Sequence, residues 1–389
     1  MPNIAILGST GSIGRMALEV AASLGPPFRV VALSASSSAH LLAEQAAETG
    51  AACLAVGDND AARTLADALP KGVNPEILVG PGALAELAAR DDVDIVLLAV
   101  VGGAGLPAAL AAARAGKRLA LANKESLVMA GRLVMAEARR SGAEVIPVDS
   151  EHSAVFQAMA SGRREEVRRV ILTASGGPFY RRPADDLARV TPAEALAHPT
   201  WSMGPKITID SATLVNKALE VIEAHHLFDL AADEIGVLIH PESTVHALVE
   251  FVDGSVIAQL GPPDMRMPIQ YALTYPGRHS APWARLDLAA LGRLHFEEPD
   301  FEKFPALRLG FEVVRRGGTL GAALSGADEV AVEAFLAGRI RFNDIVPLLK
   351  RVLASHPWTA KPTLDDILQL DAWAREETAR CLTSSTLSK

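Results

Sequence analysis

Short, uninterrupted apolar runs alternate with helically spaced apolar positions through the first 150 residues. The runs predict strands at Asn3–Leu7, Phe28–Ser34, Ala52–Val56, Glu76–Val79, Asp94–Val100, Arg118–Ala122 and Glu144–Val148. Helices are predicted between them, beginning with Ser12–Leu24 and Ala39–Glu48. Strands that are apolar throughout and separated by helices are typical of a parallel sheet covered on both faces. The pattern therefore predicts an α/β fold with an N-terminal, doubly wound, Rossmann-like domain.

The pattern changes after Asp149. Helices are predicted at Glu151–Ala160 and Ser211–His226, and strands at Arg169–Thr173, Val237–His240, Val245–Phe251 and Val256–Leu260. Prolines and charges punctuate Pro276–Pro299, and four helical patterns follow at Leu307–Val314, Ala327–Leu336, Phe342–Leu353 and Leu364–Ala379. We therefore expect a Rossmann-like domain over 1–149, a central α+β domain over 150–275, a linker over 276–300 and a small C-terminal helical domain over 301–389.

One uncharged segment, Ile95–Ala113, approaches the ~20 apolar residues that a membrane-spanning helix needs. Glycines at 102, 103 and 105 interrupt it, and Pro107 follows. A buried strand, a turn and an alanine-rich helix explain this segment better than a membrane span.

The charge balance limits the classes of partner. The chain carries a formal net charge of −9 at pH 7, which gives no general attraction to nucleic acid or to anionic membranes. A phosphorylated ligand would therefore need a local basic or amide-rich pocket. Two distant cysteines and the absence of a leader pattern lead us to expect a cytoplasmic protein.

A glycine-rich turn follows the first predicted strand and opens the first helix. Segment Gly8–Gly14 has glycine at its first, fourth and seventh positions, which lets the backbone approach a pyrophosphate at a helix N-terminus. The second strand ends in Ser34–Ser38, without the carboxylate that normally binds the ribose in NAD enzymes. This favours NADP over NAD, and the alternatives are a plain structural turn and a polar loop that contacts no ligand.

Carboxylates gather at two places. Asp149 and Glu151 follow a predicted strand, and Glu220 shares a predicted helix face with Asn216. Oxygen ligands suit a hard cation such as Mg²⁺ or Mn²⁺. From spacing alone, a helix cap at Asp149 and a surface pair of Lys217 with Glu220 are the alternatives.

Two loops offer further polar groups. Ala174–Gly177 follows a strand and presents a hydroxyl and backbone amides that suit a phosphate. His198–Gly204 combines aromatic and sulfur side chains with loop-forming residues, which is typical of a lid or of a buried corner. Glu223, His225 and His226 resemble metal ligands, but imidazoles at a helix C-terminus are favoured by the helix dipole, so a structural role is expected.

Several stretches, in order, resemble the 1-deoxy-D-xylulose 5-phosphate reductoisomerase family. They are residues 8–14, 122–128, 148–152, 174–179, 198–214, 216–217, 220–224, 240–243 and 261–266. The resemblance spans about residues 4 to 276 and is weaker in the C-terminal region.

The resemblance implies an enzyme that converts 1-deoxy-D-xylulose 5-phosphate to 2-C-methyl-D-erythritol 4-phosphate in the non-mevalonate isoprenoid pathway, with NADPH and Mn²⁺ or Mg²⁺. It implies catalytic residues Lys124, Asp149, Glu151 and Glu220, the last three as metal ligands. It implies substrate contacts from Lys124, Ser150, Glu151, Ser175, His198, Ser211, Asn216, Lys217 and Glu220. It implies cofactor contacts from Thr10, Gly11, Ser12, Ile13, Ser36, Ser37, Ser38, Asn123, Glu125 and Gly204.

The resemblance also implies a homodimer, with dimer contacts and the metal in the central domain. Many family members have glycine, a basic residue and asparagine where this chain has Ser36–Ser38, so its 2′-phosphate contacts differ. A dehydrogenase without isomerisation is the enzyme alternative. A non-catalytic nucleotide-binding relative is the other, although the metal carboxylates and Lys124 are all retained.

Overall fold

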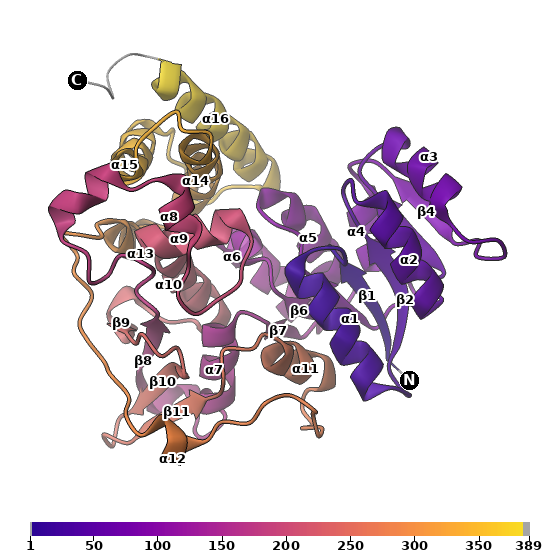
Figure 1. The fold of residues 1–389 in the computed structure, drawn as a ribbon, viewed down its shortest axis with the longest axis horizontal. Coiled ribbons are helices and arrows are strands. Elements are labelled where there is room, and N and C mark those ends of the chain that lie inside the picture. Colours follow the sequence, from indigo (N-terminus) through magenta and orange to yellow (C-terminus); the bar gives the residue numbers. More distant parts are fainter. Residues whose placement is uncertain (1, 384–389) are drawn as a thin grey trace. The chain divides into compact units, whose positions relative to one another are not determined.

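The computed structural model describes residues 2–383, which form two compact units. Unit 1 comprises residues up to 126, 132–153 and 264–284. Unit 2 comprises residues 127–131, 154–263 and those from 285 onward. The chain passes between the units several times. Figure 1 labels the helices and strands of both units and colours them by their position in the sequence.

A seven-stranded sheet forms the centre of unit 1, in the order β4-β3-β2-β1-β5-β6-β7. Its strands are β1 (Asn3–Leu7), β2 (Arg29–Ser34), β3 (Cys53–Val56), β4 (Glu76–Val79), β5 (Ile95–Leu98), β6 (Arg118–Leu121) and β7 (Val145–Pro147). Every neighbouring pair is parallel. The predicted Rossmann-like architecture is confirmed, because strands buried on both faces have the uninterrupted apolar runs from which they were predicted.

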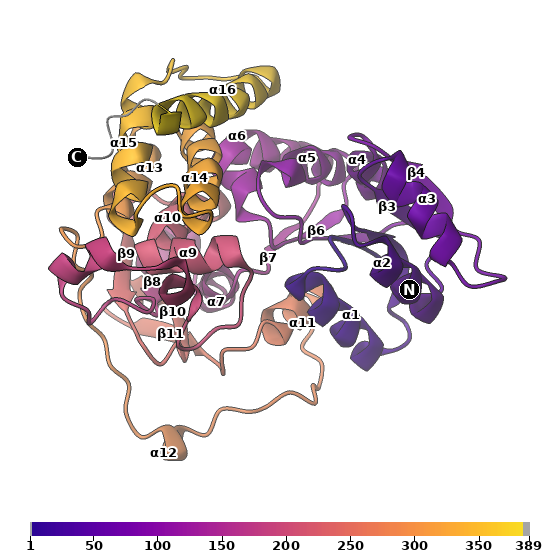
Figure 2. The ribbon, with the colours of Figure 1, turned by 45° about the horizontal axis from the view of Figure 1, so that its top comes forward.

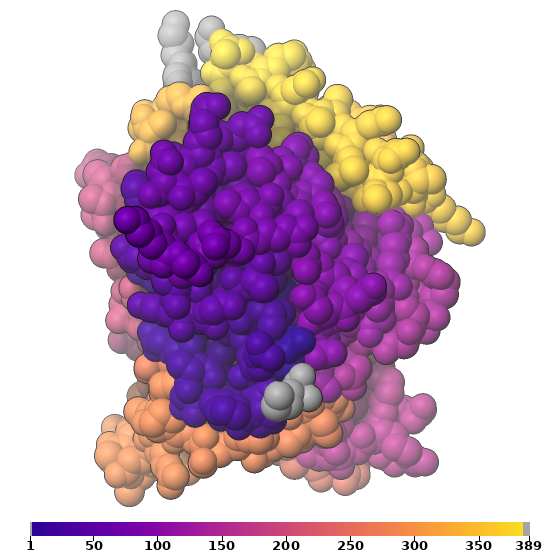
Figure 3. All heavy atoms as spheres, turned by 90° about the vertical axis from the view of Figure 1, so that its right-hand side faces the viewer, coloured from indigo at the N-terminus to yellow at the C-terminus, as the bar shows by residue number. Residues whose placement is uncertain are grey.

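The helices of unit 1 pack around this sheet. They are α1 (Ser12–Leu24), α2 (Ala39–Thr49), α3 (Asn59–Ala68), α4 (Ala83–Ala89), α5 (Leu106–Arg114), most of α6 (Lys124–Ser141), and α11 (Arg266–Thr274) from much later in the chain. Helix α1 packs on α11, and α4 packs on α5. Residues of the first hundred positions dominate the face in Figure 3.

Unit 2 contains a four-stranded sheet in the order β11-β10-β8-β9. Its strands are β8 (Val167–Ala174), β9 (Ile235–Ile239), β10 (Val245–Phe251) and β11 (Val256–Leu260). Strands β8 and β9 are parallel, whereas β10 is antiparallel to both β8 and β11. Strand β11 therefore lies at an edge of the sheet.

Helices make up the rest of unit 2, and α7 (Ser150–Met159) leads into it. The others are α8 (Pro192–Leu196), α9 (Pro205–Thr213), α10 (Val215–Phe228), α12 (Leu288–Leu291), α13 (Ala306–Arg316), α14 (Leu320–Leu336), α15 (Ile345–Ser355) and α16 (Leu364–Thr383). Short 3₁₀ turns occur at Gly103–Gly105, Arg164–Glu166, Ala184–Arg189, Ala232–Glu234 and Phe342–Asp344. One core cluster joins α9 and α10 to α13–α16, with Phe335 fully buried in it.

The predicted single helix over Ser211–His226 is wrong. The chain forms α9 and α10 instead, broken at Leu214, whose φ of 58° is left-handed. Leucine rarely adopts this conformation, and the helical spacing of apolar residues continues across the break, so the sequence carries no stop signal there.

The segment Ile95–Ala113 forms β5, a 3₁₀ turn and α5, as predicted. Within residues 2–383, no helix is both long and apolar enough to cross a membrane. The predicted linker contains only the short helix α12 and is otherwise an extended connection toward α13, which Figure 2 shows clearly. Both cysteines are buried free thiols.

Candidate active site

The carboxyl edge of the unit 1 sheet carries most of the predicted polar residues of that unit. Segment Gly8–Gly14 follows β1, Asn123 and Lys124 follow β6, and Asp149 follows β7. The strand order reverses between β1 and β5, and ligands of open parallel sheets bind outside the carboxyl ends of strands at such a point. The fold therefore brings the turn and the polar residues to one edge.

Two glycines of the turn are required by close packing. A Cβ on Gly8, whose φ is +86°, would lie 2.7 Å from the carbonyl oxygen of Ala99, and a Cβ on Gly14 would lie 2.2 Å from that of Gly8. The helix α1 can therefore begin directly at the strand end. Gly11 and Ser12 are exposed at the N-terminus of α1, where backbone amides suit a phosphate.

A buried polar network behind this turn was not predicted. Gln45 of α2 donates to the carbonyl oxygen of Ser9 at 3.0 Å and accepts from the Ser9 hydroxyl at 2.7 Å. The Ser34 hydroxyl accepts from the Gly8 amide at 2.9 Å. These contacts fix the turn from its buried side, and the only sequence signal was one polar residue on the apolar face of a helix.

Ser36–Ser38 connect β2 to α2, and all three side chains are exposed. Ser38 is the N-cap residue of α2, yet its side chain makes no capping hydrogen bond. Its exposed hydroxyl therefore lies at the N-terminus of an eleven-residue helix, at the place where dinucleotide-binding folds hold the adenosine ribose.

Lys124 and Asp149 form a buried ion pair at the carboxyl edge. The Nζ atom of Lys124 lies 2.5 Å from Oδ2 of Asp149, and both side chains are largely shielded from solvent. Asn123 positions Lys124, because its Oδ1 accepts from the Ser126 amide as the N-cap of α6. The Asn123 amide also donates to the carbonyl oxygens of Val100 and Gly102, at 2.8 and 2.9 Å.

Glu151 lies in the first turn of α7, where a negative charge is favoured by the helix dipole. The Ser150 hydroxyl donates to its carboxylate. The carbonyl oxygen of Asp149 accepts from the Ser153 amide, so Asp149 leads into the same helix while its carboxylate contacts Lys124. Two carboxylates, one on each side of a serine, form an oxygen donor set that suits a hard divalent cation.

In unit 2, the turn after β8 is tied to the loop that precedes α9. The Nδ1 atom of His198 accepts from the amides of Thr200 and Trp201, at 3.2 and 2.9 Å. The proton of the neutral ring is therefore on Nε2, which donates to the Ser175 hydroxyl at 3.0 Å. Burial lowers the pKa of His198, which favours the same neutral form.

Helices α9 and α10 carry the remaining predicted residues of unit 2. Lys217 and Asn216 both contact the carboxylate of Glu220 one turn later. Glu220 and Lys217 are buried, with side-chain exposures of 1% and 3%, so the surface pair considered from spacing is wrong. A Cβ on Gly177 would lie 2.8 Å from the carbonyl oxygen of Ser211, so the turn after β8 packs directly on α9.

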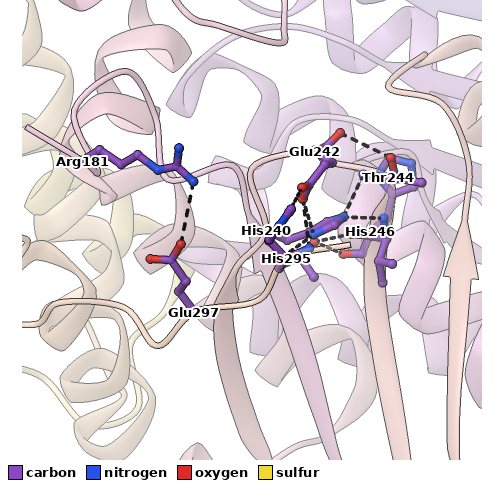
Figure 4. Close-up of polar contacts among 9 residues, drawn as sticks. Arg181, His240, Glu242, Thr244, His246, His295 and Glu297 are labelled. Carbon is purple, nitrogen blue, oxygen red and sulfur yellow. Dashed lines mark hydrogen bonds and ion pairs between the residues drawn. The ribbon is translucent and has the colours of Figure 1, made fainter. Parts of the chain in front are cut away.

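A third polar cluster lies at the end of β9, and Figure 4 shows it. The fully buried ring of His240 accepts from the amides of Thr244 and Val245 at Nε2, and its Nδ1 donates to the carbonyl oxygen of His295 at 2.7 Å. Burial opposes ionisation of Glu242, but its hydrogen bonds with His295 hold its pKa below the usual value. These hydrogen bonds hold the extended connection against the end of β9. No pattern in the sequence predicted a role for this cluster.

The structure thus assembles two groups of predicted residues, one in each unit. In unit 1 it groups the Gly8–Gly14 turn, Ser36–Ser38, Asn123, Lys124, Glu125, Asp149, Ser150 and Glu151. In unit 2 it groups Ser175, His198, Gly204, Ser211, Asn216, Lys217 and Glu220. His225 bonds the carbonyl oxygen of Leu230 at the helix end, as a structural role would require, and Glu223 is fully buried in α10.

Comparison with protein families gives three matches along the chain. Residues 4–131 match the family 1-deoxy-D-xylulose 5-phosphate reductoisomerase, and residues 145–228 match its C-terminal domain. Residues 260–377 match the DXP reductoisomerase C-terminal domain. The chain is 53% identical over 384 residues to the 1-deoxy-D-xylulose 5-phosphate reductoisomerase of Bordetella avium, with 96% of each chain covered.

Solved structures show the same similarity. The 1-deoxy-D-xylulose 5-phosphate reductoisomerase from Zymomonas mobilis in complex with NADPH is 42% identical, with a TM-score of 0.91 and coverage of 98% of this chain and 99% of that one. A DOX-P reductoisomerase in complex with NADPH, fosmidomycin and magnesium is 41% identical, with a TM-score of 0.92 and coverage of 98% of both chains.

Proposed function

The chain belongs to the 1-deoxy-D-xylulose 5-phosphate reductoisomerase family, and we propose which of its own side chains carry the reaction. The protein is an enzyme that rearranges and reduces 1-deoxy-D-xylulose 5-phosphate to 2-C-methyl-D-erythritol 4-phosphate in isoprenoid synthesis. It uses NADPH and a divalent cation.

Asp149, Glu151 and Glu220 are the proposed cation ligands. All three offer carboxylate oxygens, the donors that Mg²⁺ and Mn²⁺ prefer, and Asp149 and Glu220 each contact a lysine ammonium. A divalent cation held by them supplies Lewis-acid polarisation of substrate oxygens, and NADPH supplies the hydride. We propose that Mn²⁺ serves as well as Mg²⁺.

The observation that carries the proposal is the buried Lys124–Asp149 pair at the carboxyl edge of β6 and β7. Lys124 is positioned to donate hydrogen bonds to oxyanion character on the substrate, while Asp149 orients its ammonium group. Ser150 orients the carboxylate of Glu151.

Ser175, His198, Ser211, Asn216 and Lys217 are proposed to bind the substrate phosphate. Ser175 donates or accepts through a hydroxyl that His198 orients, and Lys217 provides a cation that Glu220 holds in place. Segment 198–204 is the proposed lid that excludes water from the reacting carbonyl. The proposed cofactor contacts are Thr10–Ile13, Ser36–Ser38, Asn123, Glu125 and Gly204.

Incubation with 1-deoxy-D-xylulose 5-phosphate, Mn²⁺ and NADPH, followed by identification of the product, tests this function. A branched tetrol phosphate is expected together with NADPH oxidation. A reduced product with the unbranched substrate skeleton would mean a dehydrogenase without isomerisation. Tight NADPH binding without oxidation would mean a non-catalytic relative.

We further propose a cytoplasmic homodimer in which β11 supplies the contact between subunits. Strand β11 is an edge strand, and Val252, Val256 and Ile257 on and beside it are 67%, 49% and 38% exposed. An exposed apolar edge strand is a template for pairing with another chain. The paired substitution Val256→Lys and Ile257→Lys should shift the light-scattering mass in gel filtration from dimer to monomer, and an unchanged mass would exclude this contact.

A further inference from the structure

A buried ion cluster links α9 to α14 inside unit 2. The Nζ atom of Lys206 lies 2.6 Å from Oδ2 of Asp210 and 2.7 Å from Oδ2 of Asp328. The two carboxylate side chains are 2% and 0% exposed. Lys206 and Asp210 are one turn apart on α9, whereas Asp328 lies in the middle of α14. The ammonium group of Lys206 therefore forms one ion pair within α9 and a second ion pair that connects α9 to α14.

The position of Lys206 is unfavourable for α9 alone. It is the second residue of the helix, where the dipole disfavours a positive charge, and the N-cap residue Gly204 provides no capping side chain. The two carboxylates compensate for this, and Asp328 is the one that belongs to another helix. The cluster therefore attaches the first turn of α9 to the C-terminal helical part of unit 2.

The first turn of α9 directly follows the 198–204 segment in the chain. His198 holds one end of the segment through its bond to Ser175. At the other end, the Gly204 carbonyl oxygen accepts from the Thr208 hydroxyl at 2.8 Å, and Pro205 and Lys206 follow. Ser211 lies one residue beyond Asp210, with the turn after β8 packed on its backbone. A shift of α9 relative to α14 would move both the segment and Ser211.

We propose that Asp328 is a positioning residue for substrate binding: through Lys206, it holds α9 so that the 198–204 segment and Ser211 are preorganised around the substrate phosphate. This inference rests on the proposed function of that site. It gives the C-terminal helical part of the chain a role in the affinity for substrate, although Asp328 itself does not touch the substrate.

The chain contains a matched control on the same helix. Glu329, next to Asp328, pairs with Arg375 of α16, which also pairs with Asp371 of its own helix, at 2.9 and 2.8 Å. Asp328→Asn leaves Lys206 paired with Asp210, and Glu329→Gln leaves Arg375 paired with Asp371. Each variant removes one ion pair between α14 and a neighbouring helix, and in each the cation keeps its second carboxylate partner. Only the ion pair removed by Asp328→Asn connects α14 to α9.

Hydrogen exchange of the full-length protein without ligands, together with steady-state kinetics, tests the proposal. We expect Asp328→Asn to speed exchange in residues 198–204 and to raise the KM for the sugar phosphate by about tenfold, a coupling of typical size between sites. The kcat and the KM for NADPH should change by less than about threefold, and Glu329→Gln should leave all of these within about twofold, as substitutions away from a coupled site do. In a Lys206→Gln background, Asp328→Asn should raise KM no further, because Lys206 is the group through which Asp328 acts.

Equal effects of Asp328→Asn and Glu329→Gln, or additive effects of the double variant, would overturn the proposal. So would faster exchange throughout α14–α16 in Asp328→Asn, because that result would mean general loosening of the helices. The wild-type protein could fail to convert the sugar phosphate while exchange of residues 198–204 is still faster in Asp328→Asn than in Glu329→Gln. In that case the proposed function is wrong, but the proposed connection from Asp328 through Lys206 to α9 is supported. If the wild-type protein does convert the substrate, and neither exchange nor KM differs between the two variants, the positioning role of Asp328 is refuted and the proposed function is kept.

Discussion

Replacing Glu220 by glutamine removes one proposed cation ligand with almost no change of shape. Glu220 is buried in α10, and its carboxylate contacts Lys217 and Asn216. The substitution therefore has two separable effects: it removes an anionic oxygen from the donor set, and it takes away the carboxylate that compensates a buried ammonium group.

The second effect sets the change in stability. Removing one partner of a buried ion pair costs about 3–5 kcal/mol when the remaining charge stays uncompensated. Lys217 is buried to a similar degree, so we expect a clearly lower melting temperature for Glu220→Gln. Lys217→Met breaks the same pair and should lower stability similarly, but it keeps the carboxylate. It is therefore the matched control for the role of Glu220 as a ligand.

The first effect is read from Mn²⁺ affinity and turnover. Glu220→Gln should weaken Mn²⁺ binding in calorimetry and lower kcat by about 10²–10³-fold, the size seen when one group that stabilises developing charge is removed. Lys217→Met should bind Mn²⁺ at least as tightly as the wild type, since a competing cation is gone. NADPH affinity should be unchanged in both, because most proposed cofactor contacts lie in unit 1. Equal Mn²⁺ affinity in the two variants, or unchanged turnover of Glu220→Gln at limiting Mn²⁺, would refute Glu220 as a ligand.

Three further predictions concern the loop and the cofactor. Trp201→Ala should lower turnover with little change in melting temperature, because Trp201 is only half-buried and its ring centroid lies 6.3 Å from that of His246; a large loss of stability with normal kinetics would identify a structural corner instead. NADPH should be preferred over NADH, because serine hydroxyls and amides at 36–38 can form two or three hydrogen bonds to the 2′-phosphate, each contributing about 1.5–3 kcal/mol. That preference, measured as kcat/KM at low and high salt, should depend little on salt, and a steep dependence would reveal a cation that reaches the phosphate. Burial lowers the pKa of His198 below the ordinary value of about 6.5, so the ordered loop is fully stable above that pH and loses stability as the pH falls toward the lower, folded-state pKa. The protection factors of the amides in residues 198–204, which correct exchange for its intrinsic slowing at lower pH, should therefore fall below about pH 6.5, and His198→Asn, which cannot titrate there, should remove this fall.

The central strands of unit 1 were predictable because strands buried on both faces are apolar along their length, and this is visible in the sequence. A strand covered on both faces must be apolar at every position, and Ile95–Leu98 meets this condition completely. The glycine turn was predictable for a related reason, since Gly8 and Gly14 lie where no Cβ fits. In both cases a local steric or solvation requirement fixes the residue type.

Other features depend on contacts that no local pattern encodes. The left-handed Leu214 that separates α9 from α10 is held by tertiary packing, and its neighbours have ordinary helical spacing. Gln45 is the one polar residue on the buried face of α2, and Asp328 shares the mostly apolar buried face of α14 with Ser325; the partners of Gln45 and Asp328 are far away in the sequence. Spacing also could not show whether Lys217 and Glu220 are a surface pair or a buried one, because the same i, i+3 geometry occurs in both settings.

The proposed ligand-binding groups share a property that explains how an acidic protein binds a phosphorylated substrate. Lys124 contacts Asp149, Lys217 contacts Glu220, and His198 bonds to Ser175. A buried charge is costly unless it is paired, so these contacts compensate or orient the groups inside the fold. When a ligand binds, each of these groups exchanges its partner in the protein for the ligand or shares it with the ligand. The binding free energy is therefore the difference between the group paired within the protein and the same group paired with the ligand. Affinity then depends on how well the ligand reproduces the geometry of the existing partners, which selects for a particular phosphorylated sugar more strongly than a general positive potential would.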